Sequence, residues 1–371
     1  MDRRAFLAGT VAASTAMAAS LSAQAARKTD KPLRILLLGG TRFIGVHLTE
    51  FALQRGHSVT FFNRGKTNPG RFPQVEKLTG DRDGQLDALK GKTWDAVIDT
   101  SGYVPRHVRL SAELLAPHIQ QYLFVSSISV YPNFATPMNE DSPVAKMPDE
   151  TVEKIEGQTY GPLKALCEKA AQTAMPGRTT ILRPGLIVGP DDNTDRFTYW
   201  PARAARGGEM IAPSSPSDGI QFIDARDLAV FTLDLLEQKT VGVYNVISPP
   251  SRFTIGRLID ASVSAANSLV KPEPKPKPVW IPSDFLEAQN VSAWQDMPVW
   301  LPPTGENTAA AQTSASRALK AGLRISDIER TVRDTLAWHL GRPQSERMKL
   351  KAGIAPEKEK AVLAAWESRK T

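Results

Sequence analysis

The sequence predicts an α/β fold, in which a doubly wound parallel sheet is followed by a smaller C-terminal α/β domain. Three observations predict it. Short apolar runs alternate with helical patterns from Leu33 onward, a glycine-rich turn joins the first run to the first helix, and this regular alternation fades after Pro184. Short β-branched or aromatic runs bounded by Gly, Asn, Asp or Ser are typical of buried parallel strands. Consecutive strand–helix units form right-handed crossovers, and such sheets bind ligands beyond the carboxyl ends of their strands.

The composition is that of an ordinary globular protein, and it excludes several classes. The chain has 371 residues, of which 41% are hydrophobic and 23% charged. At about 150 residues per domain, this length predicts roughly two domains. The single cysteine excludes an intrachain disulfide, and the five histidines show no metal-ligand spacing, so we expect no metal site. The net charge of +7 permits an anionic ligand without requiring nucleic acid.

The first 25 residues have the pattern of an export signal. The pair Arg3–Arg4 precedes a weakly apolar stretch that runs to about Leu21, and Ala23–Ala25 forms a small-residue cleavage site. The stretch is too short and too rich in Ala, Ser and Thr to hold a stable membrane span. The paired arginines resemble the twin-arginine signal of bacteria, with an ordinary secretory signal or an uncleaved anchor as the alternative. We therefore expect a periplasmic protein that uses the twin-arginine translocation machinery.

Five apolar runs are the predicted strands, at residues 34–38, 58–62, 96–99, 122–125 and 180–183. Ile44–Arg55, between the first two, is a predicted helix that ends at Gly56. Residues 222–238 predict a further strand and helix, so we expect the segment at about 218–248 to complete the sheet. The predicted organisation is therefore a sheet domain at 32–185, a second domain mainly at 186–345, and a helical tail at 346–371.

The second domain is less regular in sequence. Residues 185–216 predict mainly loops, and residues 271–278 alternate proline with charge, which predicts an extended connector or sheet edge. Trp280, Trp294 and Trp300 follow this segment, and they either stack on a ligand ring or belong to the core. The tail predicts one or two basic amphipathic helices.

A glycine-rich turn follows the first strand and opens the first helix; it consists of Gly39, Gly40, Thr41, Arg42, Phe43, Ile44 and Gly45. Glycine permits the tight turn, and the missing side chains let backbone N–H groups approach a pyrophosphate at the helix N-terminus. The turn therefore predicts a dinucleotide site. Arg42 replaces the middle glycine of the usual fingerprint, and Asn63 and Arg64 stand where an acid would bind the ribose. These arginines either pair with a 2′-phosphate or only contact the pyrophosphate, so NAD and NADP both remain open.

Six motifs in a fixed order resemble the extended short-chain dehydrogenase/reductase family, the NAD-dependent epimerase/dehydratase group. They are GGTRFIG at 39–45, GDRD at 80–83, FVSSISVY at 124–131, YGPLK at 160–164, LRPGLIVGP at 182–190 and FIDARDLA at 222–229. The turn together with FFNRG is most similar to an atypical branch that also includes chloroplast RNA-binding relatives. The resemblance implies a Rossmann-type sheet with tightly bound NAD(P) and a smaller substrate-binding domain.

Tyr160 and Lys164 form a Tyr-x-x-x-Lys pair, which places both side chains on one face of a helix, a turn apart. A neighbouring ammonium and a cationic nicotinamide both favour the phenolate, so we expect a lowered tyrosine pKa and a usable general base. The resemblance implies that Ser127 holds the developing carbonyl, with Ser126 as the fallback, and that Lys164 binds the nicotinamide ribose. The interval between Ser127 and Tyr160 predicts an insertion at about 135–154, which is either a lid or a surface loop.

The resemblance also implies further cofactor contacts. Asp81 would contact the adenine, Gly102 would leave room for the dinucleotide, and Arg183 and Pro184 would line the cleft beside the nicotinamide. Family members often form homodimers, so a homodimer is possible here as well.

The export signal bears on the reaction. Outside the cytoplasm there is no ready pool of reduced nicotinamide, so we expect a redox-neutral epimerase or dehydratase that acts on a sugar or glycoside through a transient keto intermediate. One alternative is an NAD(P)H-dependent carbonyl reductase or dehydrogenase. The other is an RNA-binding or cofactor-sensing protein on the same scaffold. Because basic residues are interleaved with acidic ones, we expect no nucleic-acid partner.

Overall fold

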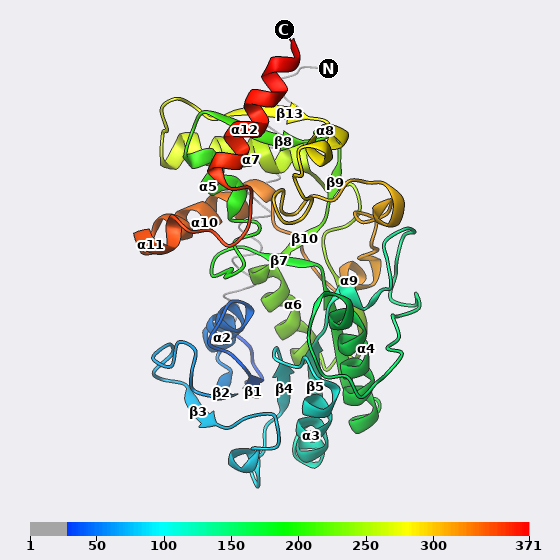
Figure 1. Ribbon diagram of the computed structural model, residues 1–371. Helices are drawn as coiled ribbons and strands as arrows, with labels where there is room; N and C mark the ends of the chain where they lie inside the picture. The colour runs from blue at the N-terminus through cyan, green and yellow to red at the C-terminus, as the bar shows by residue number, and fades with distance from the viewer. Residues whose placement is uncertain (1–27, 371) are drawn as a thin grey trace, which may run out of the picture.

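The computed structural model describes residues 28–370, in which six strands from the first half of the chain and one from the second half form a seven-stranded parallel sheet (Figure 1). Its strands are β1 (Arg34–Leu38), β2 (Ser58–Asn63), β3 (Glu76–Thr79), β4 (Ala96–Asp99), β5 (Gln121–Val125), β6 (Thr179–Pro184) and β11 (Gly242–Val246). They are arranged in the order β3-β2-β1-β4-β5-β6-β11. The chain begins at β1 in the middle of the sheet, adds β2 and β3 on one side and then adds the strands from β4 onward on the other side. The connections that follow β1 and β4 therefore run in opposite directions, which leaves a ligand site at the carboxyl ends of these two strands. The predicted doubly wound fold is confirmed.

Two layers of helices cover the sheet because its strands alternate apolar side chains between the two faces. Ile35 and Leu37 belong to the core under α2 (Ile44–Arg55) and α6 (Ala225–Glu237). Leu36 and Leu38 face the other way and pack with α3 (Pro105–Leu115) and α4 (Gly157–Ala174). β3 was not expected from sequence, because this edge strand is largely exposed and lacks an apolar run.

The second half of the chain is built from short paired strands and packed helices. β7 (Leu186–Val188) pairs with β10 (Phe222–Asp224), β8 (Glu209–Pro213) with β13 (Lys277–Ile281), and β9 (Gly219–Ile220) with β12 (Phe253–Thr254). The helices are α5 (Tyr199–Ala205), α7 (Ile255–Leu269), α8 (Ser283–Ala288), α9 (Ser316–Lys320) and α10 (Ile328–Leu340). The expectation of loops at 185–216 is wrong in part, since β7, α5 and β8 lie there. β13 begins inside the proline-rich run, which is therefore partly a sheet edge.

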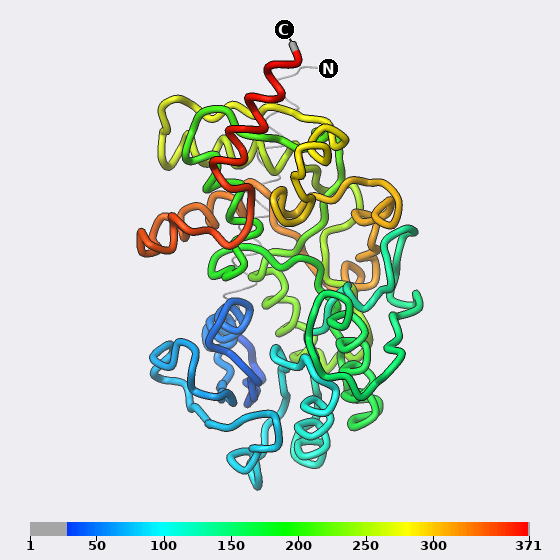
Figure 2. Tube along the Cα trace, viewed as in Figure 1, coloured from blue at the N-terminus to red at the C-terminus, as the bar shows by residue number. Residues whose placement is uncertain are grey.

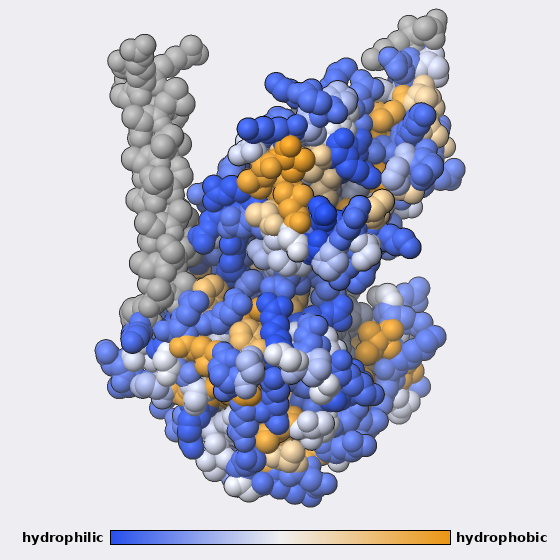
Figure 3. Space-filling view, turned by 90° about the vertical axis from the view of Figure 1, so that its left-hand side faces the viewer, coloured by the Kyte–Doolittle hydropathy of each residue, from blue (hydrophilic) through white to orange (hydrophobic). Residues whose placement is uncertain are grey.

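The C-terminal tail contains two helices, α11 (Gln344–Arg347) and α12 (Pro356–Glu367), and it packs against the second half of the chain (Figure 2). Glu359 of α12 is buried and accepts hydrogen bonds from Arg203 Nε at 2.6 Å and from the backbone N–H of Ile211 at 3.2 Å. The surface shown in Figure 3 is mainly hydrophilic, with separate apolar patches. Within residues 28–370, no helix combines the length and apolarity needed to cross a bilayer. The expected export signal at 1–25 lies outside the described residues.

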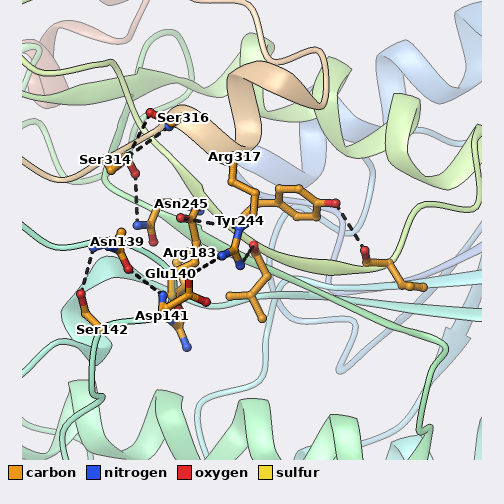
Figure 4. A network of polar contacts seen from close by, with 12 residues as sticks. Asn139, Glu140, Asp141, Ser142, Arg183, Tyr244, Asn245, Ser314, Ser316 and Arg317 are labelled. Carbon is orange, nitrogen blue, oxygen red and sulfur yellow. Dashed lines mark hydrogen bonds and ion pairs between the residues drawn. The ribbon is translucent and has the colours of Figure 1, made fainter.

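The insertion after Ser127 is held to the fold along its first part (Figure 4). Glu140 is buried and its Oε1 accepts the backbone N–H of Asn245 in β11 at 2.9 Å. Asp141 pairs with Arg317 of α9 at 2.8 Å, and the backbone N–H of Ser314 donates to the Met138 carbonyl at 2.7 Å. These bonds anchor this part of the insertion to the sheet edge, as expected of a surface connection rather than a hinged lid.

Candidate active site

A cavity of about 1330 Å³ lies at the carboxyl ends of the parallel strands. Residues that follow β1, β2, β4, β5 and β6 line one side, and residues at 193–196, 219–221 and 294–301 line the other. Drug-sized ligands occupy about 300–1,000 Å³. The cavity therefore has room for a dinucleotide and a second small molecule side by side.

The glycine-rich turn forms the floor of this cavity. Gly39 and Gly40 adopt φ values of +118° and +98°, and a Cβ at Gly45 would lie 2.6 Å from the Cα of Gly40. The first turn of α2 can therefore lie against the loop only because these side chains are missing. Phe43 adopts φ +43°, a region that non-glycine residues rarely occupy. The first amides of α2 have no partners within the helix, and this cradle fits a pyrophosphate.

The part of the cavity beside the glycine-rich turn is rich in positive charge. Arg42, Arg64 and Lys66 line the cavity there, and Asp81 is the one carboxylate among the described lining residues. Asn63 is engaged within the loop: its Nδ2 donates to the Gly39 carbonyl at 2.9 Å and its Oδ1 accepts from the Gly65 N–H at 2.8 Å. Asn63 therefore shapes the turn, and the cationic side chains remain to face phosphate groups.

Tyr160 lies beside Ser127 because α4 packs closely on the short 3-10 helix η3 (Ile128–Val130). A Cβ at Gly161 would lie 2.0 Å from the carbonyl oxygen of Ser129, so only glycine allows this approach. Ser127 caps η3, and its Oγ accepts from the backbone N–H of Ser129 at 3.0 Å. Tyr160 and Ser127 both line the cavity, as predicted from sequence.

Lys164 lies one turn further along α4, with its side chain buried at the base of the cavity. Its Nζ donates to the carbonyls of Gly102 at 2.8 Å and Val125 at 2.7 Å, which follow β4 and end β5. The ammonium also lies 4.2 Å from the centroid of the Phe124 ring. Burial lowers the pKa of Lys164 to about 8. Two of its three donors are used in this way, which leaves one for a ligand.

The electrostatics of Tyr160 differ from the expectation. Burial raises the pKa of Tyr160 above its ordinary value, and the nearby Tyr103 adds to this increase. A hydrogen bond with Ser127 and the charge of Arg196 lower the pKa in part. The expected lowering of the Tyr160 pKa by Lys164 is therefore wrong for the protein alone; the Lys164 ammonium is bound by the carbonyls of Gly102 and Val125.

Three of the predicted cofactor residues, Arg183, Ser126 and Gly102, make contacts within the protein instead of facing the cofactor site. Arg183 does not line the cavity, because its guanidinium forms a buried ion pair with Glu168 at 2.7 Å; Pro184, the next residue, does line it. Ser126 borders the cavity, but its hydroxyl donates to Glu168 at 2.5 Å. A Cβ at Gly102 would meet the Phe124 ring at 2.5 Å, so Gly102 makes room for a core side chain rather than for the dinucleotide.

Sequence reasoning missed several residues that line the cavity. Arg196 lines the cavity with its guanidinium carbon 5.5 Å from the ring centroid of Trp294. Tyr103 is 43% exposed, and its ring centroid lies 6.4 Å from that of Tyr160. No motif marked these side chains. Of the three tryptophans proposed as ring-stacking residues, only Trp294 lines the cavity; Trp300 is buried, and Trp280 packs against the core.

A sequence model of the NAD dependent epimerase/dehydratase family matches residues 35–246, more than half of the chain. The chain belongs to this family. The match spans the glycine-rich turn, the serines that follow β5, the Tyr160–Lys164 pair and the last strand of the parallel sheet. Ser127, Tyr160 and Lys164 all lie within the matched residues.

Similar proteins include both curated relatives and solved structures. Chloroplast stem-loop binding protein of 41 kDa b from Arabidopsis thaliana is 29% identical over 231 residues, which cover 57% of this chain and 58% of that protein. Human epimerase family protein SDR39U1, solved with NADPH, has a TM-score of 0.53 and 22% identity, covering 82% of this chain and 99% of that one. UDP-glucuronic acid 4-epimerase from Bacillus cereus, solved with NAD, has a TM-score of 0.57 and 14% identity, covering 82% and 96%.

The cofactor is therefore NAD(P), as expected. The cradle of the glycine-rich turn would hold its pyrophosphate, and Asp81 and Lys164 line the same cavity. Arg42, Arg64 and Lys66 suit either the pyrophosphate or an added 2′-phosphate. NAD and NADP thus both remain open.

Proposed function

We propose that this protein is a redox-neutral epimerase or dehydratase that acts on a sugar or glycoside through a transient keto intermediate. The observation that carries the proposal is the convergence of Tyr160, Ser127 and Lys164 with the glycine-rich turn on one cavity. That cavity also has a second wall, where Asn193 can contact a polyhydroxylated substrate.

In this proposal, Tyr160 as phenolate takes the proton of a substrate hydroxyl, and Ser127 donates a hydrogen bond to the oxygen as it becomes a carbonyl. NAD(P), when bound, would supply reversible hydride transfer at the carbon that carried this hydroxyl. Lys164 would hold its ribose with the one N–H that is not bound to a backbone carbonyl. When Tyr160 returns its proton to the oxygen, the residues regain their starting state, and no net oxidation has taken place.

The proposal includes export by the twin-arginine route to the periplasm, with the cofactor already tightly bound. Arg3 and Arg4 support the route, as does the small-residue site at Ala23–Ala25. Outside the cytoplasm a net reductase has no ready pool of reduced nicotinamide. A cofactor that is reduced and reoxidised within one cycle needs no such pool.

The test uses the protein purified from its native compartment. We expect released nucleotide and a nicotinamide absorbance that persists through purification. We also expect product formation from a panel of sugars and glycosides with no net change in the cofactor. If no nicotinamide copurifies and the enzyme consumes added NAD(P)H stoichiometrically with a carbonyl substrate, the protein is a reductase and the proposal fails.

RNA binding is the alternative that the name of the chloroplast relative favours. Many described surface arginines are paired with acids instead, such as Arg106 with Glu153 at 2.8 Å and Arg257 with Glu329 at 2.8 Å. Phosphate binding by unpaired cations would give an affinity that falls steeply with salt. We expect no such affinity for a structured RNA at physiological salt.

A further inference from the structure

We infer that Arg71 and Asp191 form a clasp that holds the cavity closed around NAD(P) and slows the release of this cofactor. The clasp joins the loop between β2 and β3, residues 64–75, to the loop that follows β7 in the second half of the chain. Both are positioning residues, because they act through their loops and are not part of the cavity lining. The inference rests on the proposed function and deepens it, since that function requires a tightly held cofactor.

The loop at 64–75 forms one side of the cavity beside the glycine-rich turn. Its residues Arg64 and Lys66 line the cavity, so the position of this loop decides where two cations face the cofactor phosphates. The loop also lies directly on the turn, because Asn68 Nδ2 donates to the carbonyl of Thr41 at 3.0 Å. A movement of the loop therefore disturbs both the charge and the backbone that would hold the pyrophosphate.

The loop after β7 belongs to the opposite wall. Asn193 and Thr194 of this loop line the cavity, and Asp191 lies just before them with φ +67°. The preceding residue, Pro190, lies against α2, since its carbonyl oxygen is 2.9 Å from His47 Nε2. The two loops thus approach the first turns of α2, where the pyrophosphate cradle lies, from two different parts of the chain.

Arg71 joins the two loops through a pair of parallel hydrogen bonds. Its Nη1 donates to Asp191 Oδ1 at 2.9 Å, and its Nη2 donates to Asp191 Oδ2 at 3.1 Å. Such two-pronged bonds between arginine and carboxylate are strong and fix the relative orientation of the two groups. The side chains are 33% and 23% exposed, so water screens this pair less than a pair on the open surface. Glu50 of α2 adds a second carboxylate at 4.0 Å from Arg71.

The position of the clasp gives it a kinetic effect. A dinucleotide that occupies the cavity lies between walls that carry these two loops. The loops must separate for the cofactor to leave, and the bonds between Arg71 and Asp191 must then break. An interaction that breaks before dissociation lowers the off-rate more than it changes the on-rate. The clasp would therefore keep the cofactor bound through many turnovers.

The test measures how fast the cofactor leaves, so it does not depend on turnover. The protein is loaded with NADH or NADPH and mixed with an excess of the oxidised nucleotide, and the fall in fluorescence of the bound reduced nucleotide gives the off-rate. Arg71→Gln and Asp191→Asn should each raise this rate by about 3- to 10-fold. Asparagine tolerates the left-handed backbone at this position, so Asp191→Asn removes the charge without adding strain.

Further variants separate the clasp from a general effect on stability. The double variant should release the cofactor no faster than either single variant, because both residues act through one interaction. Arg71→Lys, which keeps the charge but not the paired bonds, should restore part of the slow release. The matched control is Arg109→Gln, which removes an exposed arginine that pairs with Glu113 on α3 and should leave the off-rate unchanged.

The inference is overturned if neither reduced nucleotide binds, or if both single variants release the cofactor at the wild-type rate. It is also overturned if the effects of the two substitutions add, or if Arg109→Gln has the same effect. A merely structural role would lower the melting temperature of the cofactor-free variants and leave the off-rate unchanged. Net consumption of NAD(P)H would refute the proposed function alone, and the off-rates of these variants would still decide on the clasp.

Discussion

Replacing Lys164 with methionine tests the electrostatics at the base of the active site. Burial disfavours the charged ammonium, so the folded protein binds this proton less tightly than the unfolded chain does. The pKa of Lys164 falls from 10.5 to about 8 on folding. At about 1.4 kcal/mol per pH unit, this shift corresponds to roughly 3 kcal/mol.

The direction in which pH changes the stability depends on whether the folded or the unfolded protein loses the Lys164 proton first. Below pH 8 both states are protonated, and the full cost of burying the charge opposes folding. As the pH rises from 8 towards 10.5, the folded protein loses the proton while the unfolded chain keeps it, so stability increases. The free energy of unfolding of the wild type should therefore rise, relative to Lys164→Met, by roughly 3 kcal/mol across this range.

The assay is urea unfolding of the cofactor-free proteins at pH values from 7 to about 10.5, with the difference between wild type and variant plotted against pH. The matched control is Lys169→Met, which removes an exposed lysine from the same helix and should give a flat difference. A flat difference for Lys164→Met as well would refute the inferred burial of the charge. A difference that falls with rising pH would mean that the ammonium is stabilised by a partner instead.

Two further pairs of variants separate packing from chemistry. Gly161→Ala places a methyl group against the carbonyl of η3, so we expect a loss of about 1–3 kcal/mol in stability and reduced turnover. Gly157→Ala, at a position open to solvent, should change neither the melting temperature nor the activity. Ser127→Ala should lower kcat by about 10²–10³-fold, because its hydroxyl faces the reacting oxygen, and should cost about 0.5–2 kcal/mol of stability, because the same hydroxyl caps η3. Ser126→Ala should leave kcat near that of the wild type and cost about 1–3 kcal/mol of stability, measured by urea unfolding, because its hydroxyl binds the buried Glu168. The reverse result for the two serines would contradict their assignment.

The sheet and the glycine-rich turn were predictable because their signals are local. The turn lies between a strand and a helix in sequence, and the spacing of Tyr160 and Lys164 alone places both on one helix face. The direction of a side chain at a strand end depends on residues that are distant in the sequence. Arg183 follows the expected motif, yet it turns into the core because α4 presents Glu168 at 2.7 Å.

The substrate wall was not predictable for a similar reason. Arg196 and Trp294 come from loops that are far apart in sequence and meet only in the folded chain. Their loops are held by Asp195, which binds Arg342 just after α10, and by Asp296, which binds Lys358 of α12. A single charged residue in a loop usually lies on the solvated surface. Neither Arg196 nor the residues that hold its loop could therefore be singled out from the sequence.

The central claim is that Tyr160 is the acid–base group of a working nicotinamide site, and Tyr160→Phe tests it most directly. The variant keeps the ring that packs beside Tyr103 but lacks the hydroxyl. We predict unchanged retention of NAD(P), measured by released nucleotide, and a fall in turnover of about 10²–10⁴-fold on the substrate identified from the sugar panel. Turnover equal to that of the wild type, with the cofactor still bound, would contradict the account.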